Sequence, residues 1–449
     1  MRLIEKITFP LFLIFVFWLP IPLGSNRPIA WSFNEVWGAL LLILCLCIYS
    51  PEHWKTSLKR TKWVIMPIMA ITLWSLIQSI QPLNLTQDSG LVFVSALKSL
   101  HYLQLCLVAS VLIDTRNKLK LLATVMVVSG ICQGFYAGVV LLLHLEHSPI
   151  FNLPLGTRAS GSFVYHNHLA NFLMLNLCIG FSLLIAQLSD SNKTGLRNMI
   201  KQFFAVLLSD KAFVRLGLVI MVIALVLTRS RMGNIAFFIA LTLGSILLLF
   251  FYKPKPRSVY VLIISLFLID TFIVSNWFGL EKVKQRLVET SLESESRDDV
   301  IRYSLVAIQE RPLTGYGAGT FYSTFPAYNQ GDVKLFYDHA HNDYIQFVFE
   351  YGFVASTILL LMILVSGKQA FHAFKNRRSK LMRGIGLSSL MAIIGMTIHM
   401  SVDFPLQAPA NTLYFLLCLL MGHWANSIPN RVDRKEHSKR PTIPRGVLV

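Results

Sequence analysis

Residues 338–352, DHAHNDYIQFVFEYG, place two histidines and three carboxylates at the start of an apolar segment. Ionisable groups at a membrane boundary are expensive to desolvate, which makes them candidates for function. If one helix runs through the stretch, a polar stripe falls on one of its faces, made of His339, Asp343, Gln346 and Glu350. A capped helix end with interfacial histidines is the simpler alternative. The stripe repeats over three turns, which favours a functional site.

The composition indicates a membrane protein. The 449 residues are 54% hydrophobic and 14% charged, whereas soluble domains have about 25% charged residues. We therefore predict an all-α polytopic membrane protein with about 12 transmembrane helices. The net charge of +18 is explained by topology rather than by nucleic acid, which is not an expected partner. Segments long enough to span a bilayer lie near 7–24, 33–50, 63–80, 92–113, 121–144, 165–188, 212–228, 232–252, 258–278, 342–366, 383–402 and 409–427.

Lysine and arginine gather in alternate short loops and in the C-terminal tail. Basic loops favour the cytoplasmic side, so both termini are expected there and the long loop 279–341 outside, between spans nine and ten. That loop is expected to contain an amphipathic helix over 298–311, ended by Pro312, with Val300 or Ile301, Leu305 and Ile308 on its apolar face. We assign 1–427 to one transmembrane domain. Residues 428–449 are expected to form a basic cytoplasmic tail without fixed structure, able to touch membrane lipids.

Two motifs carry little chemistry. The six cysteines all lie inside apolar spans, so neither an extracellular disulfide nor a metal site is expected. The run GYGAGTF at 315–321 contains GxGxG, but no βαβ unit surrounds it. A tight turn that pins the loop is therefore favoured over a nucleotide site.

Four arginines at the outer ends of the spans depart from the charge bias. Arg229 and Arg231 lie in TRSRMG, Arg158 precedes the sixth span, and Arg297 lies in the long loop. The planar guanidinium group suits phosphate oxygens and stays charged at any relevant pH. Interfacial snorkelling is the alternative. Four cations on the face of the histidine cluster favour an anionic ligand.

Other polar residues point to the same outer face. Lys98 lies in the outer half of the fourth span, and Asn167 and His168 open the sixth. His399 and Asp403 are spaced i, i+4 at the outer end of the eleventh span. A carboxylate beside an imidazole can orient and polarise it.

These motifs resemble the O-antigen ligase/polymerase superfamily of bacterial membrane glycosyltransferases. HAHNDYIQFVFEYG resembles its His-x-His-Asn…Glu-x-Gly signature, and GSFVYHNHLANFL and LTRSRMG resemble two earlier segments. Arg297, fifteen residues before PLTGYG, resembles a fourth. The similarity covers about 160–405, and the first 150 residues match only in hydropathy.

The resemblance implies a multi-pass enzyme of the bacterial inner membrane whose active site faces the periplasm. The implied donor is an undecaprenyl-diphosphate-linked glycan, and the acceptor is lipid A–core or another glycan. The reaction would invert the anomeric centre and need neither cofactor nor metal. His341 matches the catalytic histidine, Arg231 the diphosphate-holding arginine, and Arg297 the loop arginine. Arg229 is assigned by proximity only.

The residues fit this chemistry independently, since imidazole suits removal of a proton from a hydroxyl and guanidinium suits a departing diphosphate. Helical phase places His339 on the polar stripe, whereas the resemblance places the chemistry on His341. Because asparagine is a preferred N-cap, the helix is expected to start near Asn342, with both histidines before it. We therefore assign His341 as the proton acceptor, with His339 in support.

Three alternatives remain from the sequence. A polymerase would use the same donor and the same residues. A transporter fits many spans with polar groups, although these cluster at one face and no repeat links the halves. A zinc hydrolase could use His339, His341 and Asp343, although further ligands are missing.

Overall fold

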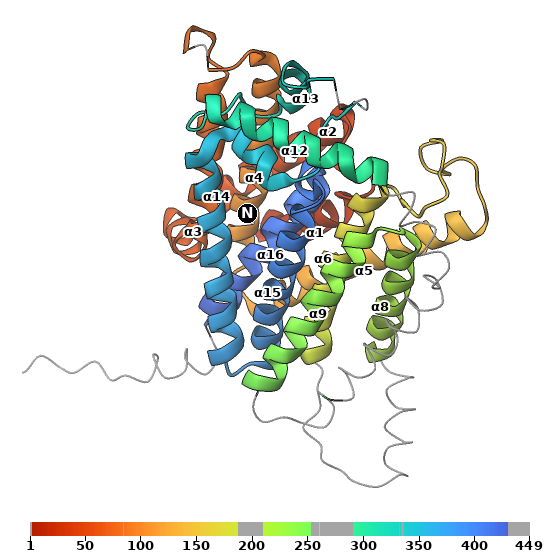
Figure 1. The fold of residues 1–449 in the computed structure, drawn as a ribbon. Coiled ribbons are helices and arrows are strands. Elements are labelled where there is room, and N and C mark those ends of the chain that lie inside the picture. The colour runs from red at the N-terminus through yellow and green to blue at the C-terminus, as the bar shows by residue number, and fades with distance from the viewer. Residues whose placement is uncertain are drawn as a thin grey trace, which may run out of the picture.

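The computed structural model describes residues 2–83, 85–186, 210–252, 260, 291–331, 333 and 336–429. Eight helices in this part of the chain are long and apolar enough to cross a membrane, which confirms the all-α polytopic class (Figure 1). They are α2 (Pro28–Ile48), α3 (Pro51–Gln78), α4 (Ser89–Leu112), α5 (Arg116–Leu142), α6 (His166–Ala186), α9 (Arg231–Phe251), α14 (Asp343–Asn376) and α15 (Lys380–Met400).

Three further helices occupy predicted spans: α1 (Arg2–Trp18), α8 (Asp210–Leu227) and α16 (Pro409–Ser427). The ninth predicted span, 258–278, lies outside the described residues apart from Tyr260. The count of twelve therefore stays a prediction. The same holds for the sidedness of the loops, the single domain over 1–427 and the C-terminal tail, of which residues 430–449 are not described.

The bundle is centred on α6, α15 and α16. In α6, 94% of the apolar window is buried, and α15 packs against α6, α9, α14 and α16. Small residues permit these close approaches. A Cβ atom on Gly384 of α15 would lie 2.7 Å from the Ser182 carbonyl oxygen of α6. Because α15 and α16 end and begin beside the histidine loop, this rigid centre supports the site.

A helical cap lies across one end of the bundle (Figure 1). It contains α12 (Ser291–Glu310) and α13 (Phe321–Thr324). The amphipathic helix expected over 298–311 is confirmed, although it begins earlier and ends one residue sooner. Its buried face carries Val300, Tyr303 and Ile308, which join a cluster with Phe349 of α14. We expected Leu305 on the apolar face, and that was wrong, because Leu305 is 45% exposed.

The GYGAGTF segment fastens this cap to α14. Tyr316 and Gly317 donate their backbone N–H groups to the Phe349 and Glu350 carbonyls, both at 2.9 Å. These carbonyls are available because Gly352 interrupts the helix at φ 79° and ψ 170°. A Cβ atom on Gly315, at φ 64°, would lie 2.5 Å from the Glu350 carbonyl oxygen. The expectation of a tight turn is confirmed, and the glycines let two backbones meet.

We expect Gly352→Ala to destabilise the protein by about 1–3 kcal/mol or more, because it adds left-handed strain and a clash. The new Cβ atom would lie 2.1 Å from the Leu313 carbonyl oxygen. Thermal unfolding in detergent measures the effect. Gly331→Ala is the matched control, since Gly331 also has a positive φ, 97°, with no atom within 4 Å. Equal shifts in the two variants would contradict the clash.

Candidate functional site

The histidine loop ends where α14 begins. Asn342 is the N-cap, and its Oδ1 accepts from the backbone N–H groups of Tyr344 at 3.0 Å and Ile345 at 3.2 Å. Its Nδ2 donates to the Ser401 carbonyl at 2.9 Å, which ties the loop to the end of α15. The expected helix start is confirmed, and both histidines precede it. His341 has φ 51°, in a region that residues other than glycine rarely adopt.

His341 faces a buried carboxylate. Its Nδ1 lies 3.8 Å from Oδ1 of Asp403. That oxygen also accepts the backbone N–H of Phe404 at 2.9 Å, and the other accepts from Nδ2 of Asn167. Nε2 of His399 lies 3.9 Å from Asp403 Oδ2. The structure therefore brings together four residues predicted from three separate segments: Asn167, His341, His399 and Asp403.

Burial sets the ionisation of this pair. It raises the pKa of Asp403 to about 6, against the lowering effects of the Phe404 amide, the Arg297 charge and the Asn167 amide. Burial also lowers the pKa of His341 to about 3, and the charges of Arg297 and His339 act in the same direction. At neutral pH the site therefore contains an ionised carboxylate beside a neutral imidazole. Arg297 is close enough to influence both groups.

Phe404 separates the two histidines. Its ring centroid lies 4.5 Å from that of His339 and 4.7 Å from that of His341. Tyr165 stacks on it at 5.6 Å with an interplanar angle of 5°, and the edge contact of His168 is at 5.1 Å. Sequence reasoning missed Phe404 and Tyr165. The available signal was that Phe404 follows Asp403 and that Tyr165 lies close to Asn167 in the sequence. Aromatic neighbours restrict the orientation of a buried polar group.

His339 has different partners. Its Nδ1 lies 3.0 Å from Nε2 of Gln346, which also donates to Glu350 Oε1 at 3.0 Å. Oε1 of Gln346 accepts the backbone N–H of Ala340 at 3.2 Å. Burial lowers the pKa of His339, so this imidazole is also neutral at pH 7. Of the predicted polar stripe, His339, Gln346 and Glu350 form one hydrogen-bonded row, whereas Asp343 has other partners.

Asp343 and His168 hold the surrounding backbone. Oδ2 of Asp343 accepts the backbone N–H of Leu406 at 3.0 Å, and Oδ1 accepts from Nε2 of Gln407 at 3.3 Å. These bonds fix the 3₁₀ turn η4 (Pro405–Gln407) that follows Phe404. The carbonyl of His168 accepts from Asn411 of α16 at 3.0 Å. Both residues therefore hold the backbone segments around the site in place.

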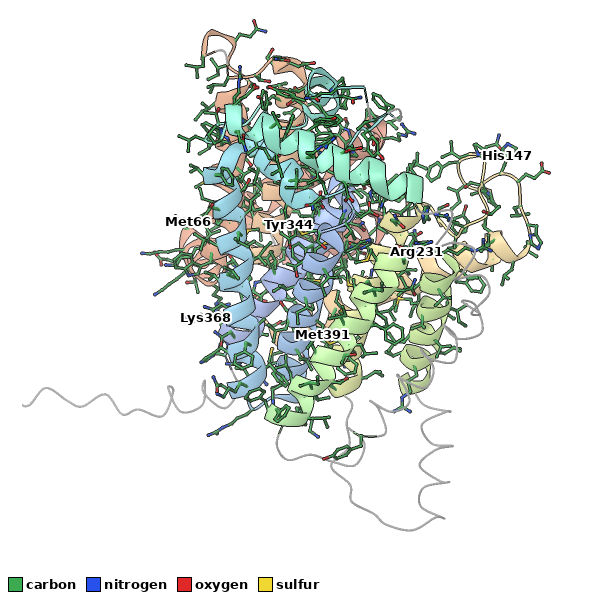
Figure 2. All side chains as sticks on the ribbon, in the orientation of Figure 1. Met66, His147, Arg231, Tyr344, Lys368 and Met391 are labelled. Carbon is green, nitrogen blue, oxygen red and sulfur yellow. The ribbon has the colours of Figure 1, made fainter. Side chains whose placement is uncertain are left out.

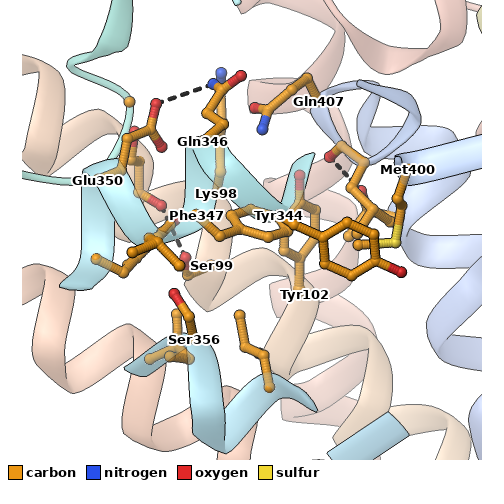
Figure 3. A pocket seen from close by; sticks show the side chains of 18 of the residues that line it. Lys98, Ser99, Tyr102, Tyr344, Gln346, Phe347, Glu350, Ser356, Met400 and Gln407 are labelled. Carbon is orange, nitrogen blue, oxygen red and sulfur yellow. Dashed lines mark hydrogen bonds between the residues drawn. The ribbon is translucent and has the colours of Figure 1, made fainter. Parts of the chain in front are cut away.

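A cavity of about 670 Å³ lies next to the His339 row, between α3, α4, α14 and α16. Its polar end is lined by Lys98, His339, Gln346 and Glu350, and its body by apolar side chains such as Ile68, Leu360 and Phe415. Figure 3 shows Lys98 close to Gln346 and Glu350, which are joined by a hydrogen bond. Lys98 is near enough to Glu350 for Coulombic attraction.

The four arginines differ in how closely the structure ties them to His341. Arg297 on α12 places its charge near His341 and Asp403. Arg231 is the first residue of α9, at the α12 end of that helix (Figure 2). Arg229 precedes it with φ 53°. Nη1 of Arg158 lies 2.9 Å from Nε2 of His166, beside the start of α6.

The zinc alternative is not favoured by this geometry. His339 faces Gln346, whereas His341 faces Asp403, so the two imidazoles diverge around Phe404. Asp343 accepts hydrogen bonds from η4 and does not face the two imidazoles. Within the described part of the chain, no three His, Cys, Asp or Glu side chains are grouped to hold a metal ion.

Comparison with known protein families gives a match to part of the chain. Residues 216–360 match the family model described as O-antigen ligase. The matched range contains three of the four arginines and the whole histidine loop, and it confirms the resemblance seen in the motifs. Asn167, His399 and Asp403 lie outside it and reach the site through the fold. Among curated proteins, none matches the chain.

Proposed function

We propose that this membrane protein, whose residues 216–360 match the O-antigen ligase family model, is a transferase. It would transfer a glycan between lipid-linked partners. The donor would be an undecaprenyl-diphosphate-linked glycan and the acceptor a hydroxyl of lipid A–core. The reaction would occur at the periplasmic face of the bacterial inner membrane, with both termini cytoplasmic. The observation that carries the proposal is the approach of His341 Nδ1 to within 3.8 Å of Asp403 Oδ1, with the charge of Arg297 near both groups.

The proposed step is a single displacement. Nε2 of His341 takes the proton of the acceptor hydroxyl while that oxygen attacks the anomeric carbon of the donor sugar. The bond between the anomeric carbon and the diphosphate oxygen breaks, and the lipid diphosphate leaves with the electron pair. Arg231, Arg229, Arg297 and Arg158 would stabilise its charge. Attack from the opposite face inverts the anomeric centre.

Asp403 would orient the base. A shortening of the 3.8 Å separation would let Nδ1–H of His341 donate to Oδ1, which leaves Nε2 as the basic nitrogen. The carboxylate would then also stabilise the imidazolium that forms. An imidazole with a pKa near 3 is a weak base, but part of that lowering comes from Arg297. A diphosphate beside Arg297 would offset its charge and raise the pKa of His341 when the donor binds.

We expect glycan transfer to fall as the pH drops through about 6, where Asp403 becomes protonated. Protonation removes the charge that holds the imidazolium, so the rate decreases on the acid side and recovers above it. Asp403→Asn should lose this acid limb and lower kcat by about 10²–10⁴-fold at pH 7.5, because an amide cannot replace the carboxylate. Initial rates from pH 5 to 8 measure the effect. An unchanged acid limb in Asp403→Asn would contradict this role.

A polymerase is the second candidate, because donor, arginines and base would be the same and only the acceptor differs. Purified protein should be incubated with lipid-linked glycan and either lipid A–core or a second lipid-linked glycan. A lipid A–core product supports the ligase, and a lengthened lipid-linked glycan supports the polymerase. No product from either acceptor, together with substrate uptake into vesicles, would overturn the transferase in favour of a transporter.

A further inference from the structure

The orientation of the Gln346 amide is determined by its neighbours. The side chain is 1% exposed, and Oε1 lies 3.2 Å from the backbone nitrogen of Ala340. A backbone N–H can only donate, so the amide oxygen must face Ala340. The amide NH₂ group then faces Glu350 Oε1 at 3.0 Å, a carboxyl oxygen that accepts. A flipped amide would bring two donors together at Ala340.

This orientation sets the tautomer of His339. The NH₂ group of Gln346 uses one hydrogen for Glu350 and directs the other at Nδ1 of His339, 3.0 Å away. Nδ1 must therefore be unprotonated, and a neutral imidazole then carries its hydrogen on Nε2. The imidazole ring lies against the Phe404 ring, with 4.5 Å between the ring centroids and an interplanar angle of 32°. His339 is thus a hydrogen-bond donor with a fixed direction.

His341 has the opposite arrangement. Its Nδ1 faces the Asp403 carboxylate oxygen at 3.8 Å, which favours a hydrogen on Nδ1 and leaves Nε2 able to accept a proton. Two histidines separated by one residue are therefore prepared for different tasks. One can remove a proton, and the other can only donate a hydrogen bond.

The cavity indicates what His339 would bind. His339 lines its polar end, where no hydrogen bond to Nε2 is found among the described residues. Lys98 is the one lysine or arginine among the described lining residues, and the acids Asp338 and Glu350 line the same cavity. A diphosphate would bind the arginines around His341 more strongly. Neutral oxygen acceptors such as sugar hydroxyl or ring oxygens suit this end of the cavity, and the apolar body excludes water that would compete.

We propose that His339 donates a hydrogen bond from Nε2 to an oxygen of the acceptor glycan in this cavity, and that Gln346 is the positioning residue that sets its tautomer. The identity of the ligand rests on the proposed function, whereas the tautomer does not. The acceptor would approach from the cavity side of Phe404, and the diphosphate would lie on the arginine side.

The tautomer is tested without substrate. Full-length protein labelled with ¹⁵N-histidine is compared with His339→Gln, and the difference spectrum isolates His339. We expect a protonated Nε2 and an unprotonated Nδ1, with loss of this preference in Gln346→Leu. A protonated Nδ1 in the wild-type protein would overturn the proposal, whether or not the protein transfers glycans.

The role is tested by a conservative replacement. The amide nitrogen of glutamine can reach the position of Nε2 and donate from it, so His339→Gln should keep the acceptor KM within about threefold of wild type. His339→Ala should raise it about tenfold, the effect of one lost hydrogen bond, with donor binding unchanged. His341→Gln should lose kcat instead, because an amide cannot take a proton.

The exposed His147, which lies in the loop before α6 and away from the site (Figure 2), provides the control His147→Gln. It should behave as wild type. If His339→Gln is as impaired as His339→Ala while donor binding is intact, His339 is not a donor of this kind. A fall in kcat with unchanged acceptor KM in His339→Ala would also overturn the proposal.

Discussion

Replacing His341 by alanine is expected to lower kcat for glycan transfer by about 10²–10⁴-fold, the usual contribution of a general base. The imidazole is neutral at pH 7, faces Asp403 at 3.8 Å and lies near Arg297. Donor binding should be unchanged, because binding depends on the arginines rather than on the proton acceptor. Single-turnover rates measured beside donor affinity separate the two effects.

His339→Ala is the informative companion, since it removes the neighbouring imidazole from the same loop. We expect a smaller effect from it, located in the KM for the acceptor. His147→Ala controls for the loss of an exposed histidine. If His339→Ala is inactive and His341→Ala active, the base is His339 and the assignment moves two residues toward the N-terminus.

Neutralising Arg231 is expected to lower kcat/KM for the donor by about 10²–10³-fold, similar to the loss of one donor to a developing oxyanion. Arg231 begins α9, and Ser230 caps this helix by accepting from the Gly233 N–H at 3.2 Å. The positive end of the helix dipole adds to the guanidinium charge. Arg231→Lys should rescue poorly, because a point charge replaces a planar fork. Wild-type transfer by Arg231→Ala would remove it from the site.

Arg297→Ala should reduce the affinity for the donor in the same assay, because its charge already reaches His341 and Asp403. Arg302→Ala is the matched control on the same helix. Arg302 is 61% exposed and pairs with Asp299 at 2.9 Å. An exposed pair of this kind contributes little, so transfer should be unchanged. Equal losses in the two variants would indicate that only the stability of α12 is affected.

Much of the framework could be predicted from local pattern. Hydropathy gave eleven segments that are helices in the described structure, because apolar runs of this length satisfy their backbone only as helices in a bilayer. Asn342 marked the start of α14, because its side chain accepts the backbone N–H groups of Tyr344 and Ile345. The glycines at 315 and 317 marked a close backbone approach, because a positive φ favours glycine. Leu305 was misplaced, because helical spacing does not say which of two apolar stripes faces the bundle.

The sequence by itself therefore determined the membrane class, the helix start at Asn342 and the set of candidate residues, since these depend on neighbours within a few positions. The tertiary structure alone decided how the site is arranged. Asn167 and Asp403 are 236 positions apart and meet through the packing of α6 against α15. Phe404 lies between the histidines, and their Nδ1 atoms face opposite kinds of group, the donating amide of Gln346 and the carboxylate of Asp403. The direction of a buried imidazole depends on contacts between distant segments, and no periodicity in a single segment records those contacts.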